Sequence, residues 1–359
     1  MWGVVALGRA LDHLLFPGFK RQQVREPLFI VAPPRSGTTF TQKLLALDTG
    51  RFVHSKLYQT ILPSVTWQKL VHGLIALDRL LGRPLERCVG WVERRWFGSW
   101  DELHKLRLNE PEEDDGYFVY TFVTEAIFLL FPFIDELWEA GFVDNLPAND
   151  QQKLMRYYKS CLQRHLYVNG PDKMLLSKST QFPGSLHALH QAFPDARFVT
   201  IIRHPYESVP SHVSLFYMAW QTHSLHLGKQ STASRAYARL SLAWYRHLFE
   251  VKDRLPSERF YSFDFRQLTA APAPVLLAMY AHFGFKADPA FQKAILVASQ
   301  QPPSRQPHHY SLEEFGLSRE WIQRYVGDIM DAYGLERGER KVVEVPAIET
   351  LPNVPNLAG

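Results

Sequence analysis

The sequence predicts an α/β fold of three layers, in which helices cover both faces of a central parallel β-sheet. Three observations support this fold class. Short apolar runs alternate along the chain with segments of helical periodicity. The first run, LFIVA at 28–32, is apolar throughout and ended by prolines, as buried parallel strands often are. A long, mostly helical stretch separates this run from the next one, which indicates a helical insertion.

The predicted elements follow one another as strand, helix, strand, helix. Strands are expected at 28–32, 173–178, 197–203 and 259–265, with helices at 38–48 and 185–193. Further helices are expected from the third strand to about residue 255 and again after the fourth strand, before an extended, proline-bearing tail. This order favours parallel pairing, and ligands of such sheets bind at the carboxyl ends of the strands.

Composition and charge argue against several classes of protein. The chain of 359 residues has 40 basic and 36 acidic residues, a net charge of +4, and no clustered basic face of the kind that binds nucleic acid. Its two cysteines, Cys88 and Cys161, lie far apart and in no metal spacing, which argues against a disulfide framework or a zinc site. We therefore expect no nucleic-acid partner, no metal and a reducing, cytoplasmic compartment.

The N-terminal residues 1–25 are predicted to carry an amphipathic helix rather than a signal peptide. No basic start precedes the apolar part, and Arg9, Asp12 and His13 interrupt it. Two interpretations stay open: a helix packed on the domain, or an interfacial membrane contact helped by Trp2. The apolar run at 126–134 is too short to span a bilayer, so a soluble protein is predicted.

The segment APPRSGTT, residues 32–39, has the outline of a phosphate-binding loop. It departs from the nucleotide pattern G-x-x-x-x-G-K-[ST], because Ala32 replaces the first glycine and Thr38 replaces the lysine. Gly37 and the amides of the following helix can still approach an anion, but triphosphate chemistry with Mg²⁺ would lack its lysine. Arg35 fits one phosphate and a transferring group of lower charge, such as a sulfuryl group. A polar-capped turn without a ligand is the alternative.

A second candidate phosphate element is TIIRHPYESVPSH, residues 200–212. Arg203 stands at the end of a predicted strand, and Ser211 follows eight residues later. An arginine can bind a phosphate through two parallel hydrogen bonds, and a nearby hydroxyl can complete the contact. Each element alone is a weak signal, but the two together, in this order and at this separation, form a strong one.

With both elements in place, the chain resembles the sulfotransferases that depend on 3′-phosphoadenosine-5′-phosphosulfate (PAPS). The resemblance is closest to the bacterial-type branch, whose loop reads P-R-S-G-T-T, and it covers about residues 28 to 335. It implies a P-loop-like fold and metal-free, in-line transfer of a sulfuryl group from PAPS to a hydroxyl. It also implies two groups of donor-binding residues: Arg35, Ser36, Gly37, Thr38 and Thr39 around the 5′-phosphosulfate, and Arg203 with Ser211 on the 3′-phosphate.

Two segments are candidates for the base that takes the acceptor proton. The cytosolic branch uses a histidine shortly after a lysine; here Lys178 is kept, and can polarise the leaving group, but the histidine is missing. The bacterial-type branch carries an acidic P-x-E-D-E cluster, which EPEEDDGYF at 110–118 matches. We expect Glu113 to be the base, with Asp114 next, because packed like charges raise the pKa of one carboxylate. An acidic first helix turn is the structural alternative.

Three further residues are assigned through the resemblance alone. Phe265 stands where the family often has a tyrosine, so its ring could still stack on adenine but has no hydroxyl to offer. His308 and Tyr310 match the family's terminal run and are expected to line the donor site, which the tail 300–359 would close. The whole chain, 1–359, is then predicted to be one domain, with the insertion 54–170 on the acceptor side.

The predicted acceptor follows from the composition of the insertion. Aromatic residues there fit either a helical core or a site for a lipid-like molecule, and they are Tyr58, Trp67, Trp91, Trp96, Trp100, Tyr117, Phe118, Tyr120 and Phe122. No dense basic run suggests a polysaccharide groove. The hypothesis is a hydrophobic small molecule or lipid with a hydroxyl group, reached through peripheral contact of the N-terminal helix with a membrane.

Two other functions stay open from the sequence. A kinase-type phosphotransferase of the P-loop class would need Mg²⁺, and the chain lacks both the loop lysine and a clear strand-end aspartate. A catalytically inactive nucleotide-binding relative would bind donor and product without transfer. The missing histidine after Lys178 motivates this second alternative.

Overall fold

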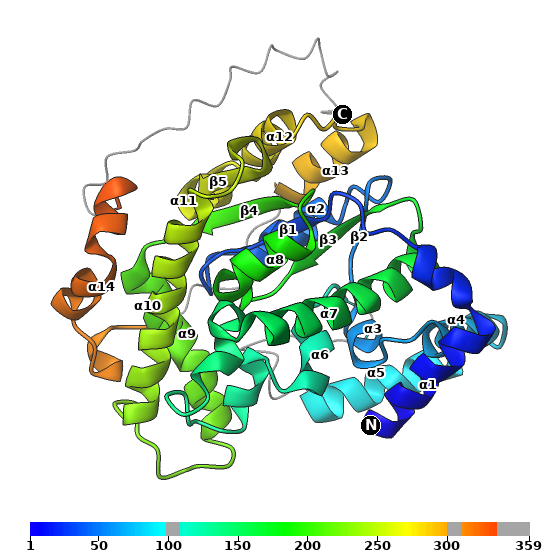
Figure 1. Ribbon diagram of the computed structural model, residues 1–359, viewed down its shortest axis with the longest axis horizontal. Coiled ribbons are helices and arrows are strands. Elements are labelled where there is room, and N and C mark those ends of the chain that lie inside the picture. Colours follow the sequence, from blue (N-terminus) through cyan, green and yellow to red (C-terminus); the bar gives the residue numbers. More distant parts are fainter. Residues whose placement is uncertain (98–107, 109, 300–309, 336–359) are drawn as a thin grey trace, which may run out of the picture.

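The computed structural model describes residues 1–97, 108, 110–299 and 310–335. At its centre lies a five-stranded, all-parallel sheet with the order β2-β3-β1-β4-β5 (Figure 1). The strands are β1 (Leu28–Ile30), β2 (Phe52–Val53), β3 (Met174–Lys178), β4 (Arg197–Ile202) and β5 (Phe260–Asp264). The predicted α/β class with a parallel sheet is confirmed, and four of these strands lie where the sequence places them.

The central strand β1 has neighbours that come much later in the chain. It pairs with β3 on one side and β4 on the other, so that Ile30 lies beside Lys178 and Val199. After β1 the chain first builds one side of the sheet and then crosses to the other side. In parallel sheets, ligands bind at the carboxyl ends of the strands where the order reverses in this way. The topology therefore directs attention to the loop after β1.

Helices cover both faces of the sheet, because alternate residues of each strand point to opposite sides. On one face Leu28 and Ile30 pack against α2 (Thr38–Leu45), α12 (Pro272–His282) and α13 (Pro289–Ser299). On the other face Phe29 and Val31 pack against α7 (Ala148–Asn169), α8 (Leu186–Ala192) and part of α10 (Thr232–Lys252). The short α11 (Phe265–Ala270) follows β5 directly.

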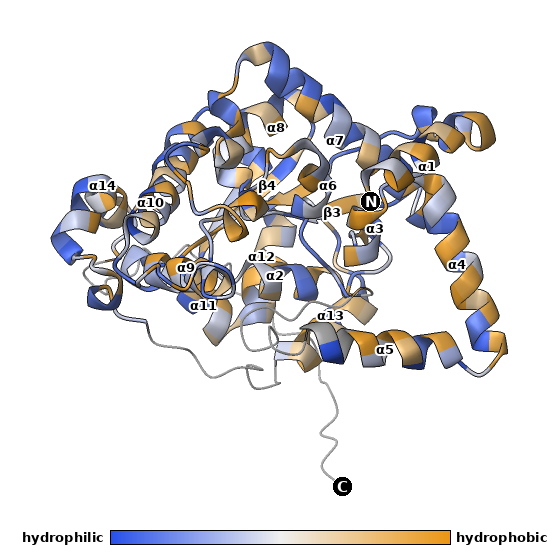
Figure 2. Ribbon diagram, turned by 90° about the horizontal axis from the view of Figure 1, so that it is seen from below, coloured by the Kyte–Doolittle hydropathy of each residue, from blue (hydrophilic) through white to orange (hydrophobic). Residues whose placement is uncertain are grey.

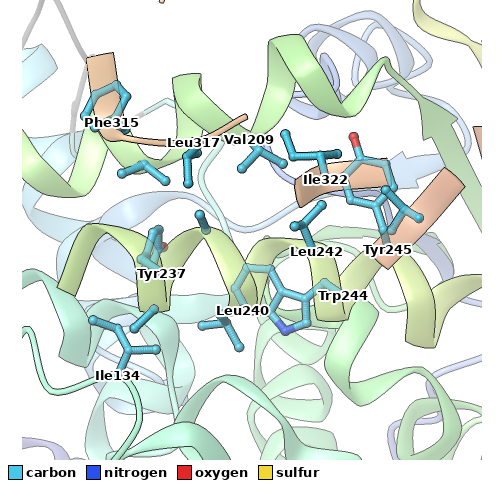
Figure 3. Packing of buried hydrophobic residues seen from close by; sticks show 14 of the residues in the cluster. Ile134, Val209, Tyr237, Leu240, Leu242, Trp244, Tyr245, Phe315, Leu317 and Ile322 are labelled. Atoms are coloured by element: carbon cyan, nitrogen blue, oxygen red, sulfur yellow. The ribbon is translucent and has the colours of Figure 1, made fainter. Parts of the chain in front are cut away.

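A third hydrophobic cluster lies beside the sheet, where α10 packs against α9 (Pro205–Trp220) and α14 (Arg319–Ala332). Figure 3 shows Tyr237, Leu240 and Trp244 of α10 facing residues from several other elements. Val209 of α9 and Ile322 of α14 belong to the same cluster. Because α9 carries Ser211, this packing fixes the position of one predicted phosphate contact.

The insertion is partly helical and partly built of short turns. Its helices are α3 (Leu57–Ile61), α4 (Val65–Leu80), α5 (Pro84–Phe97), α6 (Asp115–Phe118) and α7. The 3₁₀ turns among the described residues are Pro17–Arg21, Val119–Thr121, Glu125–Leu129, Trp138–Gly141, Val143–Asn145, Phe182–Ser185, Ser257–Arg259 and Glu313–Phe315. The sequence missed these turns and also β2, whose two residues are too few to show a pattern.

The N-terminal helix α1 (Trp2–Leu15) is packed on the domain. Its Asp12 is fully buried and forms an ion pair of 2.8 Å with Arg164 of α7. The same carboxylate accepts hydrogen bonds from Ser64, Val65 and Thr66 at the start of α4. The packed interpretation is therefore confirmed for the buried face of α1. Among the described residues, none of the helices is both long and apolar enough to cross a bilayer.

Candidate active site

Three adjacent strands deliver the candidate residues to one edge of the sheet. The loop of Arg35 follows β1, Lys178 ends β3, and Arg203 follows β4 directly. Because β3, β1 and β4 are parallel neighbours, their carboxyl ends meet at the same edge. Residues that are far apart in the sequence therefore become neighbours here.

The loop after β1 is held open by two residues in the left-handed region of backbone space. Arg35 has a φ of 62° and Gly37 a φ of 87°. Glycine adopts this region without strain, whereas arginine does so at a cost, which is typical of loops shaped for a function. A Cβ atom at Gly37 would also lie 2.9 Å from the Phe265 ring. Only glycine fits between this ring and the first turn of α2.

The two predicted phosphate elements are in direct contact. Arg35 Nε donates a hydrogen bond of 3.1 Å to Ser211 Oγ, and Arg203 Nη1 donates one of 2.7 Å to the Arg35 carbonyl. The Arg203 guanidinium also lies over the Phe265 ring, 4.5 Å from its centroid, and pairs with Glu207 at 3.1 Å. Two arginines, a hydroxyl and an aromatic face thus form one cluster, with the chemistry that binds phosphate and stacks on a planar base.

One buried hydroxyl in this loop points to an oxygen-rich ligand. Ser36 is fully buried, and within the described residues its Oγ has no partner at hydrogen-bond geometry, although the Tyr245 hydroxyl lies nearby. A buried hydroxyl without a partner costs free energy. A phosphate or sulfonate oxygen would supply the missing acceptor, so the loop fits such a group.

A second cluster joins Lys178 to the predicted base. Lys178 is 1% exposed, and its Nζ lies 2.6 Å from Glu113 Oε1 and 2.9 Å from Thr39 Oγ1. The Glu113 side chain is 18% exposed, so a substrate can reach it. The lysine thus links the carboxylate of the insertion to the first turn of α2, next to the Arg35 loop.

Asp114 lies behind this cluster rather than in it. Its carboxylate accepts hydrogen bonds from Ser177 Oγ at 2.6 Å and from the Tyr158 hydroxyl, and the residue is 1% exposed. Its backbone N–H donates to the Lys178 carbonyl at 2.8 Å, which orients the segment. Burial raises the pKa of Asp114 to about 6. Of the two acids that the sequence proposes as base, only Glu113 is within reach of a substrate.

The raised pKa of Asp114 predicts a pH dependence of stability. The native state holds this proton more tightly than the unfolded chain, since the pKa is about 6 rather than 3.8. The free energy of unfolding should therefore fall as pH rises between these values. Asp114→Asn removes this dependence. The free energy of unfolding of this variant, taken relative to that of the native protein, should therefore rise by up to about 3 kcal/mol from about pH 4 to about pH 7. Urea unfolding at both pH values measures the difference. Asp253→Asn, on the surface, should show no such change, and a constant difference for Asp114→Asn would contradict the account.

Thr180 is a functional candidate that the sequence analysis missed. Its hydroxyl lies 3.5 Å from Glu113 Oε2 and 3.3 Å from Asp115 Oδ2, and it also contacts Glu125. One hydroxyl carries one proton, so three carboxylates around it favour a proton on at least one of them. Burial raises the pKa of Asp115 well above its usual range, and the negative charge of Glu113 raises it further. The position of Thr180, two residues after Lys178 at a strand end, was the available signal.

A buried histidine completes this network from another helix. His212 Nε2 lies 2.7 Å from Glu125 Oε1, its Nδ1 lies 2.8 Å from Ser241 Oγ, and Tyr237 donates to the same Glu125 oxygen. His212 follows Ser211 directly on α9. A hydrogen-bonded path therefore runs from the second phosphate element to the acidic cluster, and no sequence motif indicated it.

The remaining predicted residues lie apart from these clusters or outside the described residues. Tyr310 is half-buried and packs against the cluster of α9, α10 and α14. His308 lies outside the described residues, as does most of the tail 300–359. Their role at the donor site stays a prediction. Over the described part of the chain, no three His, Cys, Asp or Glu side chains gather in a way that would hold a metal ion.

Comparison with known proteins assigns the family. A model of the sulfotransferase family matches residues 27–289, a span that includes all five strands and both clusters. The chain belongs to the sulfotransferase family. Two curated relatives are the omega-hydroxy-beta-dihydromenaquinone-9 sulfotransferases Stf3 of Mycobacterium bovis and Mycobacterium tuberculosis. Each is 22% identical over 342 residues, which covers 94% of this chain and 80% of the relative.

Solved structures of other sulfotransferases share the fold. Sulfotransferase STF9 from Mycobacterium avium superposes with a TM-score of 0.72 at 19% identity, covering 92% of this chain and 81% of that one. Sulfotransferase STF1 from Mycobacterium tuberculosis gives 0.62 at 20% identity, covering 89% of this chain and 81% of that one. At these identities the likeness shows the common fold.

Proposed function

We propose that this sulfotransferase moves a sulfuryl group from PAPS to the hydroxyl of a hydrophobic or lipid-like acceptor by in-line transfer. One observation carries the donor assignment: Arg35, Ser211 and Arg203 are joined by hydrogen bonds of 3.1 and 2.7 Å. A donor that has one phosphate at the loop and another at the Arg203 side matches this pair of sites. ATP has no 3′-phosphate and would leave the second site without an anion.

In this proposal the donor is held by the residues that the sequence suggests. The 5′-phosphosulfate lies among the Arg35 guanidinium, the Ser36 hydroxyl and the amides of Gly37, Thr38 and Thr39, where the dipole of α2 favours negative charge. Arg203 and Ser211 hold the 3′-phosphate. The Phe265 face, already beside Arg203, provides stacking for adenine.

The proposed transfer needs a base, a stabilised leaving group and no metal. Glu113 accepts the proton of the acceptor hydroxyl, whose oxygen forms a new bond to sulfur. The bond between sulfur and the 5′-phosphate oxygen breaks, and its electron pair leaves with 3′,5′-adenosine bisphosphate. Lys178, 2.6 Å from Glu113 and 2.9 Å from Thr39, is placed to stabilise the leaving oxygen. Arg35 offsets the charge on the sulfuryl group.

Two observations support a lipid-like acceptor. The Stf3 relatives act on a menaquinone derivative, to judge by their names, and the insertion that carries Glu113 exposes apolar side chains. Not every aromatic residue of the insertion belongs to an acceptor site: Tyr117 and Phe118 are fully buried in the core, whereas Phe122 and Trp91 are exposed. The hydrophobic-acceptor proposal therefore rests on the exposed group.

Thermal unfolding with 3′,5′-adenosine bisphosphate tests the donor site. At 100 times its dissociation constant, the bisphosphate should stabilise the native protein by about 2.7 kcal/mol, whereas ATP with Mg²⁺ should add far less. Arg203→Ala should lose most of this gain. Arg235→Ala, an exposed arginine on α10, is the matched control and should keep it.

The opposite pattern would favour another function. Stabilisation by ATP with Mg²⁺ alone would support the kinase-type alternative. Stabilisation by the bisphosphate without transfer to any hydrophobic alcohol, and without slow hydrolysis of PAPS, would support an inactive nucleotide-binding relative.

A further inference from the structure

Helices α4 and α5 form an arm that projects from the body of the protein. Figure 2 shows the two helices meeting at a sharp corner at one side of the molecule. The corner is made by Gly82 and Arg83, which both have positive φ, of 82° and 65°. From residue 73 to residue 89 every residue except Asp78 is exposed. We call residues 69–97 the arm.

The arm exposes a continuous series of large apolar side chains. On α4 and its end, Leu70, Leu74, Leu77 and Leu81 follow the spacing i, i+4, i+7, i+11, which places them on one helix face. Leu77 is 51% exposed and Leu80, beside this face, is 84% exposed. A helix of a globular protein normally buries such an apolar stripe against the core. The exposed stripe of the arm therefore favours a partner of apolar character.

The second helix repeats the pattern. Leu85, Val89 and Val92 follow the spacing i, i+4, i+7 on α5 and are all exposed; Trp91 is 61% exposed as well, on another side of the helix. The two helices meet at a corner (Figure 2), and the residues of both stripes are exposed, so neither stripe covers the other. An exposed stripe of aliphatic residues on one helix face is typical of helices that lie in a membrane interface.

The charges of the arm identify the partner. Its exposed basic residues are Lys69, Arg79, Arg83, Arg87 and Arg95, whereas Glu86 is the exposed acid among the arm side chains that the structure describes. The other acid described there, Asp78, is buried and accepts hydrogen bonds from the amides of Leu85 and Glu86 at 2.7 and 3.0 Å. The charge available to a partner is therefore positive, which complements an anionic surface.

We propose that the arm docks this protein on a membrane surface that contains anionic lipid. The apolar stripes of α4 and α5 enter the interface, and the net positive charge of the exposed arm side chains adds attraction to the anionic surface. This inference names the source of the acceptor and in that respect rests on the proposed function, because a lipid-like acceptor resides in the same surface.

A second copy of the chain is a weaker candidate for this face. A twofold interface brings the same patch of both copies together. The five exposed bases and one exposed acid that the structure describes on the arm would then lie close to the same groups of the other copy, which costs free energy through like-charge repulsion. An anionic bilayer has no such penalty.

The arm also lies next to the candidate site in the chain. It comes between Lys56, the N-cap of α3, and Pro111, and these two residues form a β-bridge with each other. Pro111 is two residues before Glu113. The segments that come before and after the arm in the chain therefore meet two residues before the proposed base.

Vesicle sedimentation with the full chain tests the proposal. The protein should sediment with vesicles of equal parts phosphatidylglycerol and phosphatidylcholine, and far less with phosphatidylcholine alone or at high salt. Leu74→Glu with Leu77→Glu should lower the partition coefficient at least tenfold. Leu225→Glu with Leu296→Glu, two exposed leucines elsewhere that make the same charge change, should leave it unchanged.

Three results would overturn the proposal: no binding of the native protein to the anionic vesicles, equal binding by the arm variant, or a dimer in light scattering that the arm variant dissociates. Stabilisation by 3′,5′-adenosine bisphosphate should be the same in both double variants, which shows that they are folded. If the bisphosphate fails to stabilise the native protein while the vesicle results hold, the proposed donor is wrong and the membrane contact stands.

Discussion

Replacing Glu113 by Gln should lower kcat by about 10²- to 10⁴-fold, the usual contribution of a positioned general base. Glutamine has the same shape and keeps an oxygen that can accept a hydrogen bond from the Lys178 ammonium. In the native protein this ammonium lies 2.6 Å from Glu113 Oε1. It cannot take a proton at neutral pH. The substitution therefore separates proton transfer from the structural task of holding the lysine. Single-turnover transfer from PAPS to an alcohol acceptor measures the effect on the chemical step.

A matched control lies three residues earlier. Glu110 forms an exposed ion pair with Lys43 at 3.5 Å, so Glu110→Gln changes the same charge on the same segment without touching Lys178. This variant should keep kcat within a factor of about two, because exposed ion pairs contribute little. Donor binding, followed by thermal stabilisation with the bisphosphate, should be retained in both variants. Near-native turnover of Glu113→Gln would show that the carboxylate only positions Lys178.

The contrast between Glu113 and Asp114 shows what the sequence could not reveal. The acidic cluster marks both residues equally, and neither charge nor spacing separates them. The backbone decides, because the Asp114 N–H bonds to the Lys178 carbonyl at 2.8 Å. With the backbone held in this way, the Asp114 carboxylate accepts a hydrogen bond from Ser177, whereas the Glu113 carboxylate accepts one from Lys178. The pairing joins segments that are far apart in the chain, which a local pattern does not encode.

Local patterns did predict the frame of the site. Apolar runs at the four longer strands located β1, β3, β4 and β5 to within two residues at either end. The glycine and arginine of the first loop could be singled out because their chemistry is tied to their position after a strand. The network of Thr180, Glu125 and His212 was not found, since its members come from three segments that meet only in the folded chain. The apolar stripes of the arm have the same periodicity as a buried helix, so exposure could not be predicted.

Replacing Asp12 by Ala should lower the free energy of unfolding by about 3–5 kcal/mol, the cost of removing one partner of a buried ion pair. Both side chains are buried, with Asp12 Oδ2 and Arg164 Nε 2.8 Å apart. The same carboxylate accepts the N–H groups of Val65 and Thr66 at 3.1 and 2.8 Å and so caps α4. Its removal leaves a buried guanidinium without its counter-charge and the first turn of α4 without its acceptors. Urea unfolding measures the change.

Two variants show whether the charge itself is responsible. Asp150→Ala, which removes the exposed partner of Lys153, should cost less than about 1 kcal/mol. Asp12→Ala combined with Arg164→Met should be more stable than Asp12→Ala alone, because removing both charges relieves the unpaired guanidinium. If the double variant is less stable than the single one, the destabilisation comes from the cap of α4 and from packing of Arg164 on Phe19 instead. In the sequence, Asp12 interrupts an apolar N-terminal run. In the fold, it joins α1 to α7 and to the first turn of α4.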